Sequence, residues 1–162
     1  MATKCKSSFE SKFYNKKRKC LYDVLGDGKI RPNQLFALSL TYPVLDPSSE
    51  EAKEMLETVT KKLLNSYGLK TLAKGEENYV EVYEGDGARR DFSYHQGITW
   101  TSLLGPYYNE MKKVAINTKN KKEKTKYEVL LKDFVEDVTK TFSKEIVERG
   151  CVGSVAEIYD SK

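Results

Sequence analysis

The stretch P-N-Q-L-F-A-L-S-L, residues 32–40, predicts a short helix that is apolar on almost every side. Pro32 stands where the first residue of a helix would lie, a position at which its missing amide hydrogen is not needed. The apolar residues that follow are Leu35, Phe36, Leu38 and Leu40. A helix without a polar face must be buried, so this stretch is predicted to lie in the interior of the domain.

A second, amphipathic helix is predicted directly downstream. Ser48 or Ser49 can cap it, and Glu50 and Glu51 suit the positive end of the helix dipole. Its apolar residues recur at helical spacing with Lys and Glu between them, namely Ala52, Met55, Leu56, Val59, Leu63 and Leu64. This pattern is typical of a helix that covers a core with one face, and Gly68 is predicted to end it.

The same order of helices recurs in the second half of the chain. An apolar helix is predicted over Ile98–Ile116, with Trp100 about one turn inside it and a kink at Gly105-Pro106. A lysine-rich polar loop is predicted over residues 117–126. The longest amphipathic helix then runs from Tyr127 and stops at Gly150.

Residues 65–96, between the two pairs of helices, carry several glycines and no helical period. A long structured loop is predicted there, with Tyr79–Tyr83 as its one short alternating stretch. Long loops inside compact domains are usually functional or disordered.

Apolar and amphipathic helices that alternate predict an all-α fold with about four to five helices and long loops. A double ring of helices, with the apolar ones inside, would use this order, and so would a helical array or bundle. The 162 residues, 39% hydrophobic and 32% charged, are expected to form a single domain over residues 1–162.

Charge, hydropathy and cysteine usage exclude several classes of protein. The net charge of +4 is far below the basic excess of a nucleic-acid binder. No window approaches the roughly 20 apolar residues of a membrane span, and Met1–Lys6 does not begin a signal peptide, so a cytoplasmic protein is expected. Cys5, Cys20 and Cys151 are widely spaced and the sequence has one His, so free thiols are expected and no metal site is predicted.

Three stretches, taken in order, resemble the glycogen debranching enzymes in their amylo-alpha-1,6-glucosidase domain. The first is I-R-P-N-Q-L-F-A-L-S-L, residues 30–40. The second begins with Y-G-L-K-T-L at residues 67–72 and continues to R-D-F-S-Y-H-Q-G-I-T-W at residues 90–100 and L-L-G-P-Y at residues 103–107. The third is G-S-V-A-E-I-Y-D, residues 153–160.

This resemblance implies an (α/α)6 toroid that hydrolyses alpha-1,6-linked glucose at a glycogen branch stub, with inversion and with no metal or organic cofactor. The expected partner is glycogen or a related alpha-glucan. Most helices of the ring are absent, so residues 1–162 are expected to be a partial toroid, a fragment that is inactive alone. The fragment is expected to pair with the missing N-terminal part of the domain or to associate with itself.

The resemblance also implies site residues. It makes Glu157 the candidate general base, while the general acid is expected upstream of residues 30–40 and so outside the chain. Asp86 and Asp91 do not match the acid, and Asp91 is expected to pair with Arg89, Arg90 or Arg31. Inverting hydrolysis needs both an acid and a base.

The candidate substrate-binding residues are Arg31, Asn33, Gln34, His95, Gln96 and Trp100. Amide and imidazole groups can hydrogen-bond sugar hydroxyls, and an indole ring can cover the apolar face of glucose. From the residues alone, plain surface is the more usual place for a glutamate such as Glu157, and a structural role is more usual for Trp100 and His95. Arg31, Asn33 and Gln34 can either line a pocket or cap the helix.

Three alternatives remain open at this point. The chain can be a glucan-binding module without catalysis that presents Tyr83, His95 and Trp100. It can be a remnant or the product of a split gene. Basic residues over Lys112–Lys126 could bind RNA, but the only aromatic residue there is Tyr127 at the edge, and the helix beyond it is balanced in charge.

Overall fold

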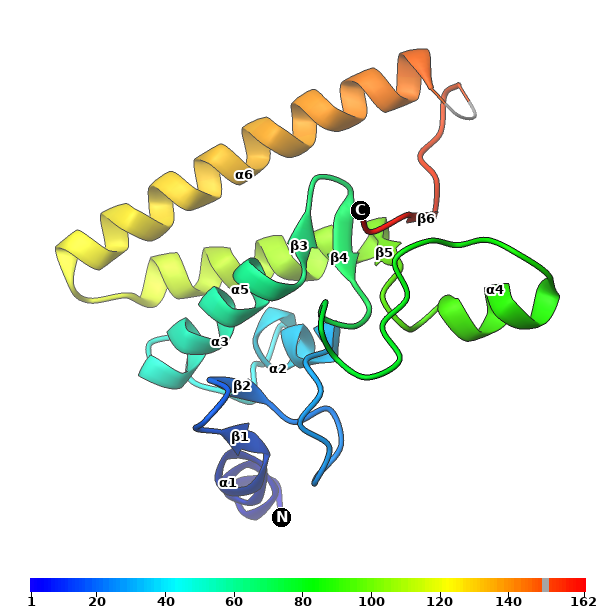
Figure 1. The fold of residues 1–162 in the computed structure, drawn as a ribbon. Coiled ribbons are helices and arrows are strands. Elements are labelled where there is room, and N and C mark those ends of the chain that lie inside the picture. Colours follow the sequence, from blue (N-terminus) through cyan, green and yellow to red (C-terminus); the bar gives the residue numbers. More distant parts are fainter. Residues whose placement is uncertain (150–151) are drawn as a thin grey trace.

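The structure, a computed structural model, describes residues 1–149 and 152–162 (Figure 1). The described residues form the α-helices α1 (Ala2–Phe13), α2 (Phe36–Ser39), α3 (Glu50–Lys62), α4 (Gly87–Ser93), α5 (Leu104–Asn117) and α6 (Lys121–Glu148). Short 3-10 helices, η1 (Pro32–Leu35) and η2 (Thr101–Leu103), lead into α2 and α5. The strands are β1 (Tyr14–Asn15), β2 (Cys20–Leu21), β3 (Leu64–Asn65), β4 (Gly68–Lys70), β5 (Thr99–Trp100) and β6 (Ile158–Tyr159).

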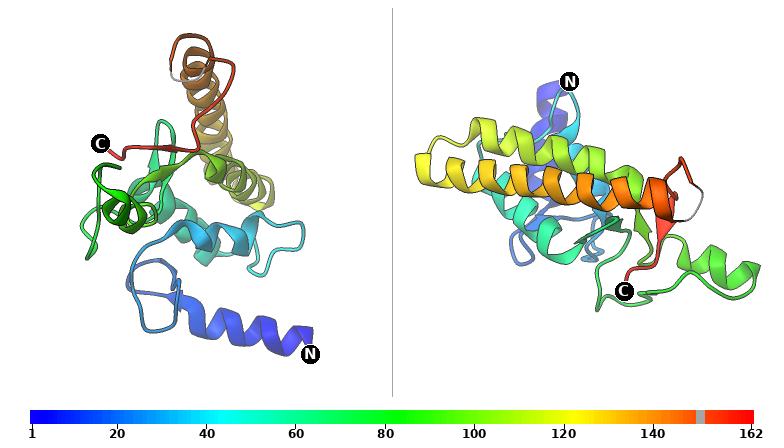
Figure 2. Two further views of the ribbon diagram at one scale, coloured as in Figure 1. Left: turned by 90° about the vertical axis from the view of Figure 1, so that its right-hand side faces the viewer. Right: turned by 90° about the horizontal axis from the view of Figure 1, so that it is seen from above.

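The core lies where α2, α3, α5 and α6 meet, and α6 turns back to run beside α5 (Figure 2). Tyr107 on α5 is fully buried at this junction. Its ring meets the edge of Phe134 on α6 at 5.0 Å, and its hydroxyl is 2.7 Å from that of Thr60 on α3. A buried tyrosine needs a partner for its hydroxyl, so this contact lets one side chain join three helices.

The short helix of residues 32–40 and the amphipathic helix after it are confirmed as η1 with α2 and as α3. The predicted burial of the first helix holds for Leu35 and Leu38 but is wrong for Phe36 and Leu40, which are exposed. Ser49 is the N-cap of α3, and its hydroxyl accepts a hydrogen bond from the Ala52 amide at 3.2 Å. Four apolar residues of α3, Ala52, Met55, Leu56 and Val59, are buried as the spacing predicts. The helix ends at Lys62, before the predicted stop, because Gly68 belongs to the hairpin β3–β4.

The prediction of a polar loop over residues 117–126 is wrong from Lys121 onward, because α6 begins at this residue. The side chain of Asn120 caps α6 by accepting from the amides of Lys122 and Glu123. Glu123 is also 2.6 Å from the Lys53 ammonium on α3. Capping and contacts with α3 therefore stabilise a first turn that has no apolar pattern to reveal it.

The described chain is mostly helical, but it also contains two small antiparallel sheets that an all-α fold does not predict. β1 pairs with β2, and the second sheet has the order β3-β4-β5-β6. Trp100 stands in β5, opposite Leu69 of β4 and Ile158 of β6, so its predicted place inside a helix is wrong. Strands of two or three residues are too short for alternation to show in a sequence.

Other boundaries differ in smaller ways. Gly105-Pro106 lies in the first turn of α5, where proline is tolerated, rather than at a kink. The short helix α4 interrupts the loop predicted over residues 65–96, and Tyr79–Tyr83 forms no strand. The predicted helix stop at Gly150 and the thiol of Cys151 lie outside the described residues.

Two further expectations concern cysteines and membranes. Cys5 is exposed and Cys20 is buried, and both are free thiols. Within the part of the chain that the structure covers, no helix has both the length and the apolar character to cross a membrane.

Candidate functional site

An aromatic cluster forms around β5 and the loop that leads into it. Trp100 stacks on His95 with ring centres 5.0 Å apart and planes 21° from parallel. Tyr94 meets Trp100 edge to face at 4.7 Å, and its carbonyl accepts a hydrogen bond from the Trp100 indole at 3.0 Å. Tyr83 approaches Tyr94 at 5.8 Å. The cluster joins Tyr83, which precedes α4 in the sequence, to residues that follow this helix. The hydrogen bond from the indole nitrogen fixes the orientation of Trp100.

Glu157 lies at the edge of this cluster. One of its carboxylate oxygens accepts a hydrogen bond from the Tyr94 hydroxyl at 2.6 Å. Its carbonyl accepts from the amide of Thr101 at 3.2 Å, next to the pair formed by Trp100 and Ile158. The pairing of β6 with β5 thus brings together two residues that are 57 positions apart in the sequence, Trp100 and Glu157.

The hydrogen bond to Glu157 raises the pKa of Tyr94 to about 12. Loss of the phenol proton would place a second negative charge beside the carboxylate. The side chain of Glu157 is exposed, which leaves it accessible to water and to a ligand. A carboxylate oriented by a tyrosine, open to water and next to stacked rings, can serve as a general base for a sugar substrate.

Arg31 joins the first and second family-like stretches of the chain. Its guanidinium donates to the carbonyl of Thr71 at 3.1 Å, the carbonyl of His95 at 2.7 Å and the side-chain oxygen of Gln96 at 2.9 Å. The carbonyl of Gln96 accepts from the Val80 amide at 2.6 Å. These contacts fix the loop that carries His95 and Gln96. The guanidinium of Arg31 therefore has a structural role, because it binds groups of the protein itself.

Gly97 follows this loop in a conformation that favours glycine, with φ near +139°. A Cβ atom at Gly97 would collide with the carbonyl oxygen of Val80 and with the ring of Tyr79. The close approach therefore requires glycine at this position.

Asn33 and Gln34 face other parts of the protein. Asn33 donates to a carboxylate oxygen of Asp23 at 2.8 Å. Gln34 is buried, and its side-chain amide accepts from the Leu21 backbone amide at 3.1 Å and donates to the carbonyl of Arg31 at 2.8 Å. Both ends of this side chain are used to join η1 to β2, so Gln34 supports the backbone of Arg31.

Asp86 and Asp91 are the acidic residues that do not match the expected general acid. Asp86 caps α4 and accepts a hydrogen bond from the Arg89 amide at 2.9 Å. The ion pair expected for Asp91 is not formed with any of the three candidate arginines in the described part of the chain. Sequence reasoning also did not single out Tyr94 as a partner of Glu157, although it stands beside His95 in the family-like stretch.

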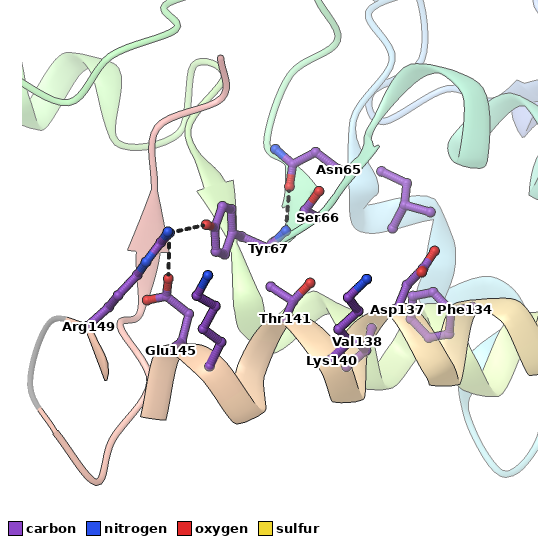
Figure 3. Close-up of a pocket in the computed structure, with 12 residues that line it drawn as sticks. Asn65, Ser66, Tyr67, Phe134, Asp137, Val138, Lys140, Thr141, Glu145 and Arg149 are labelled. Atoms are coloured by element: carbon purple, nitrogen blue, oxygen red, sulfur yellow. Dashed lines mark hydrogen bonds and ion pairs between the residues drawn. The ribbon is translucent and has the colours of Figure 1, made fainter. Parts of the chain in front are cut away.

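A separate cavity of about 630 Å³ lies between the hairpin β3–β4 and α6 (Figure 3). Figure 3 shows Asn65, Ser66 and Tyr67 on the hairpin side and Thr141 on the helix side. None of the predicted site residues lines it. Tyr67 stacks on Tyr159 of β6 at 4.3 Å, so this wall of the cavity supports the strand that follows Glu157.

The described residues contain no group of three or more His, Cys, Asp and Glu side chains that could hold a metal ion. The groups at the site are the carboxylate of Glu157, the phenol of Tyr94, the imidazole of His95 and the indole of Trp100. These groups suit proton transfer and the binding of hydroxyl groups and apolar ring faces.

The sequence was compared with families of known proteins and with curated proteins. No curated protein matches the sequence. A family model described as amylo-alpha-1,6-glucosidase matches residues 1–162, the whole chain. The match includes all three family-like stretches, and with them Arg31, His95, Trp100 and Glu157. The chain therefore belongs to the amylo-alpha-1,6-glucosidase family.

Proposed function

We propose that this chain takes part in the hydrolysis of alpha-1,6-linked glucose at glycogen branch stubs, with Glu157 as the general base of an inverting reaction. The observation that carries the proposal is the 2.6 Å hydrogen bond from Tyr94 to Glu157 at the edge of the stacked His95 and Trp100 rings. Family membership supplies the reaction class. The proposal keeps the cytoplasmic location expected from the sequence.

In this proposal the Glu157 carboxylate removes a proton from the water that attacks the anomeric carbon. The Tyr94 hydroxyl orients one carboxylate oxygen, and the other is free to accept the proton. Inversion requires the acid and the base to stand on opposite faces of the sugar, roughly 6.5 to 9.5 Å apart, so that water fits between the base and the sugar.

The stacked rings are proposed to bind the glucose unit. Trp100 would cover an apolar face of the sugar, with His95 and Gln96 as hydrogen-bonding partners for hydroxyl groups. Arg31 would position those two residues, because its donors already reach the carbonyl of His95 and the side chain of Gln96. Asn33 and Gln34 would hold η1 in place, in keeping with their contacts.

We propose the same partial toroid that the resemblance implies. Helices α2 and α5 would belong to the inner ring, while α3 and α6 would belong to the outer ring. Buried residues on α2 and the contact of α2 with α5 support this assignment. A polypeptide segment outside residues 1–162 would supply the general acid, so the chain alone is proposed to bind glucan without hydrolysing it.

Electrophoresis through gels that contain glycogen tests the binding part of the proposal. We expect glycogen to retard the parent chain and Trp100→Ala to weaken the interaction by about tenfold, the loss expected when an aromatic contact is removed. Phe92→Ala, which changes an exposed aromatic residue outside the cluster, is the matched control. A parent chain that migrates equally with and without glycogen would overturn the proposed function.

Release of glucose from a phosphorylase limit dextrin tests the catalytic part. We expect no glucose from the parent chain or from Glu157→Gln. Glucose released by the parent but not by Glu157→Gln would support the role of Glu157 and show that the acid is present in the chain after all. Glucose released equally by both would remove Glu157 from the mechanism.

A further inference from the structure

We propose that Ser161 and Thr99 are positioning residues for Glu157, because their buried hydroxyl groups fix the segment that carries the base to the loop that carries the sugar-binding rings. The inference rests on the proposed function for the role of Glu157. The contacts themselves do not depend on it.

Ser161 is buried within an exposed segment. It is 2% exposed, whereas Asp160 and Lys162 on either side are exposed. Its amide donates to the carbonyl of Glu81 at 2.8 Å. Its hydroxyl lies 2.6 Å from the hydroxyl of Thr99 and donates to the carbonyl of Gly97 at 2.5 Å. A serine that is buried among exposed neighbours and uses both its amide and its hydroxyl acts as an anchor.

The direction of these hydrogen bonds can be worked out from their ends. The carbonyl of Gly97 can only accept, so the single Ser161 proton goes to it. The hydroxyl of Thr99 must then donate to Ser161. At the other end, the amide nitrogen of Asn65 donates to the Thr99 hydroxyl at 2.6 Å. Each group therefore donates to the next in one direction, from Asn65 to Thr99, from Thr99 to Ser161 and from Ser161 to the Gly97 carbonyl. Loss of either hydroxyl interrupts this series of hydrogen bonds.

This chain of hydrogen bonds joins three parts of the candidate site. Gly97 follows His95 and Gln96, and its amide donates to the Thr71 hydroxyl at 2.9 Å. Thr99 precedes Trp100 in β5. In the sequence, Glu157 directly precedes β6 and Ser161 follows it. The hydroxyl pair therefore holds the end of β6 against two neighbours, the loop that carries His95 and Gln96 and the strand that carries Trp100.

The anchor matters because β6 is weak by itself. It has two residues and lies at the edge of its sheet, and among the described residues it pairs with β5 and with no other strand. The carbonyl of Glu157 is held by the Thr101 amide just before β6, and Ser161 fixes the chain just after it. Tyr159 also stacks on Tyr67, and the side chain of Asp160 accepts from the Tyr83 amide at 2.9 Å, so loss of the hydroxyl pair loosens the strand rather than releasing it. We expect this loosening to let the Glu157 carboxylate shift away from the Tyr94 hydroxyl.

The experiment compares Ser161→Ala and Thr99→Val, which each remove one hydroxyl, with Thr99→Ser, which keeps it. Ser143→Ala on the exposed face of α6 is the control. Helix content by circular dichroism checks that each variant folds. Hydrogen exchange is followed at the Thr101 and Ser161 amides, and the titration of Tyr94 is followed by NMR, with Tyr94→Phe to assign its signal.

We expect Ser161→Ala and Thr99→Val to speed exchange at both amides by about tenfold, because each leaves a buried polar group without its partner. The double variant should exchange no faster than either single one, since both break the same chain. The titration midpoint of Tyr94 should fall from about 12 toward 10.0, because the carboxylate has moved away. Thr99→Ser and Ser143→Ala should behave like the parent.

Two results would overturn the inference. One is an unchanged exchange rate at Thr101 in Ser161→Ala, which would show that the anchor does not reach Glu157. The other is an unchanged Tyr94 titration. Both measurements are made without glucan. A parent chain that fails to bind glycogen would therefore overturn the proposed function, while exchange and titration would still test the anchor.

Discussion

Glu110 is a fully buried carboxyl group on α5, and neither of its oxygens has a hydrogen-bond partner in the described part of the chain. Burial raises the pKa of this carboxyl well above its ordinary value of 4.5. The folded state therefore keeps a proton that the unfolded state releases, so the free energy of unfolding decreases as the pH rises above 4.5. The loss is complete once the pH passes the pKa in the folded state.

We expect Glu110→Met to increase the free energy of unfolding at pH 8 by about 1 to 3 kcal/mol, the cost of burying a polar group without a partner. The variant should also lose part of the stability difference between pH 5 and pH 8. Urea denaturation at both pH values measures this, with the exposed Glu128→Met on α6 as the control. Equal pH dependence in the parent and in Glu110→Met would contradict the expected protonation.

The contact between Tyr94 and Glu157 predicts a titration that is independent of catalysis. In Glu157→Gln the charged acceptor is lost, so the pKa of Tyr94 should fall from about 12 toward its ordinary value of 10.0. NMR of the Tyr94 ring across this pH range gives the answer, and Glu148→Gln on α6 is a matched control. A Tyr94 pKa that stays near 12 in Glu157→Gln would show that the hydrogen bond is not formed in solution.

At the scale of elements, the start of α3 depends on one of two adjacent serines. Ser49 accepts from the Ala52 amide, whereas the Ser48 hydroxyl donates to the side chain of Asp46 at 2.9 Å. Ser49→Ala should therefore lower the free energy of unfolding by about 1 kcal/mol through loss of the cap. Ser48→Ala, its neighbour, should have a smaller effect in the same urea denaturation. The reverse order would show that the cap is assigned to the wrong serine.

At the scale of the whole molecule, several large apolar side chains remain exposed around α2. Phe36 is 41% exposed, Leu40 53% and Tyr42 89%. Exposed apolar surface favours contacts with other molecules, so we expect the chain to associate with itself. Light scattering should show a mass that rises with concentration, and the Leu40→Ser, Tyr42→Ser double variant should lower that rise. A sharp monomer peak at high concentration would contradict the prediction.

Helices with a strong pattern could be predicted from the sequence, and the candidate site only in part. The buried face of α3 follows from its spacing, and η1 with α2 follows from Pro32 and the apolar run behind it. The first turn of α6 could not be predicted, because contacts with α3 and an Asn120 cap stabilise it in place of an apolar face. The strand position of Trp100 could not be predicted either, because two residues have no period.

The sequence by itself determined the mostly helical character of the chain, the position of its main core helices and its family. These features depend on local residue spacing and on short motifs, which can be recognised without knowing which distant segments are in contact. Only the tertiary structure decided that Tyr94 is the partner of Glu157, that Arg31 holds His95 and Gln96, and that Ser161 anchors the segment beyond β6. The physical reason is that hydrogen bonds between distant segments depend on how strands pair, and pairing between strands this short leaves no mark in the order of residues.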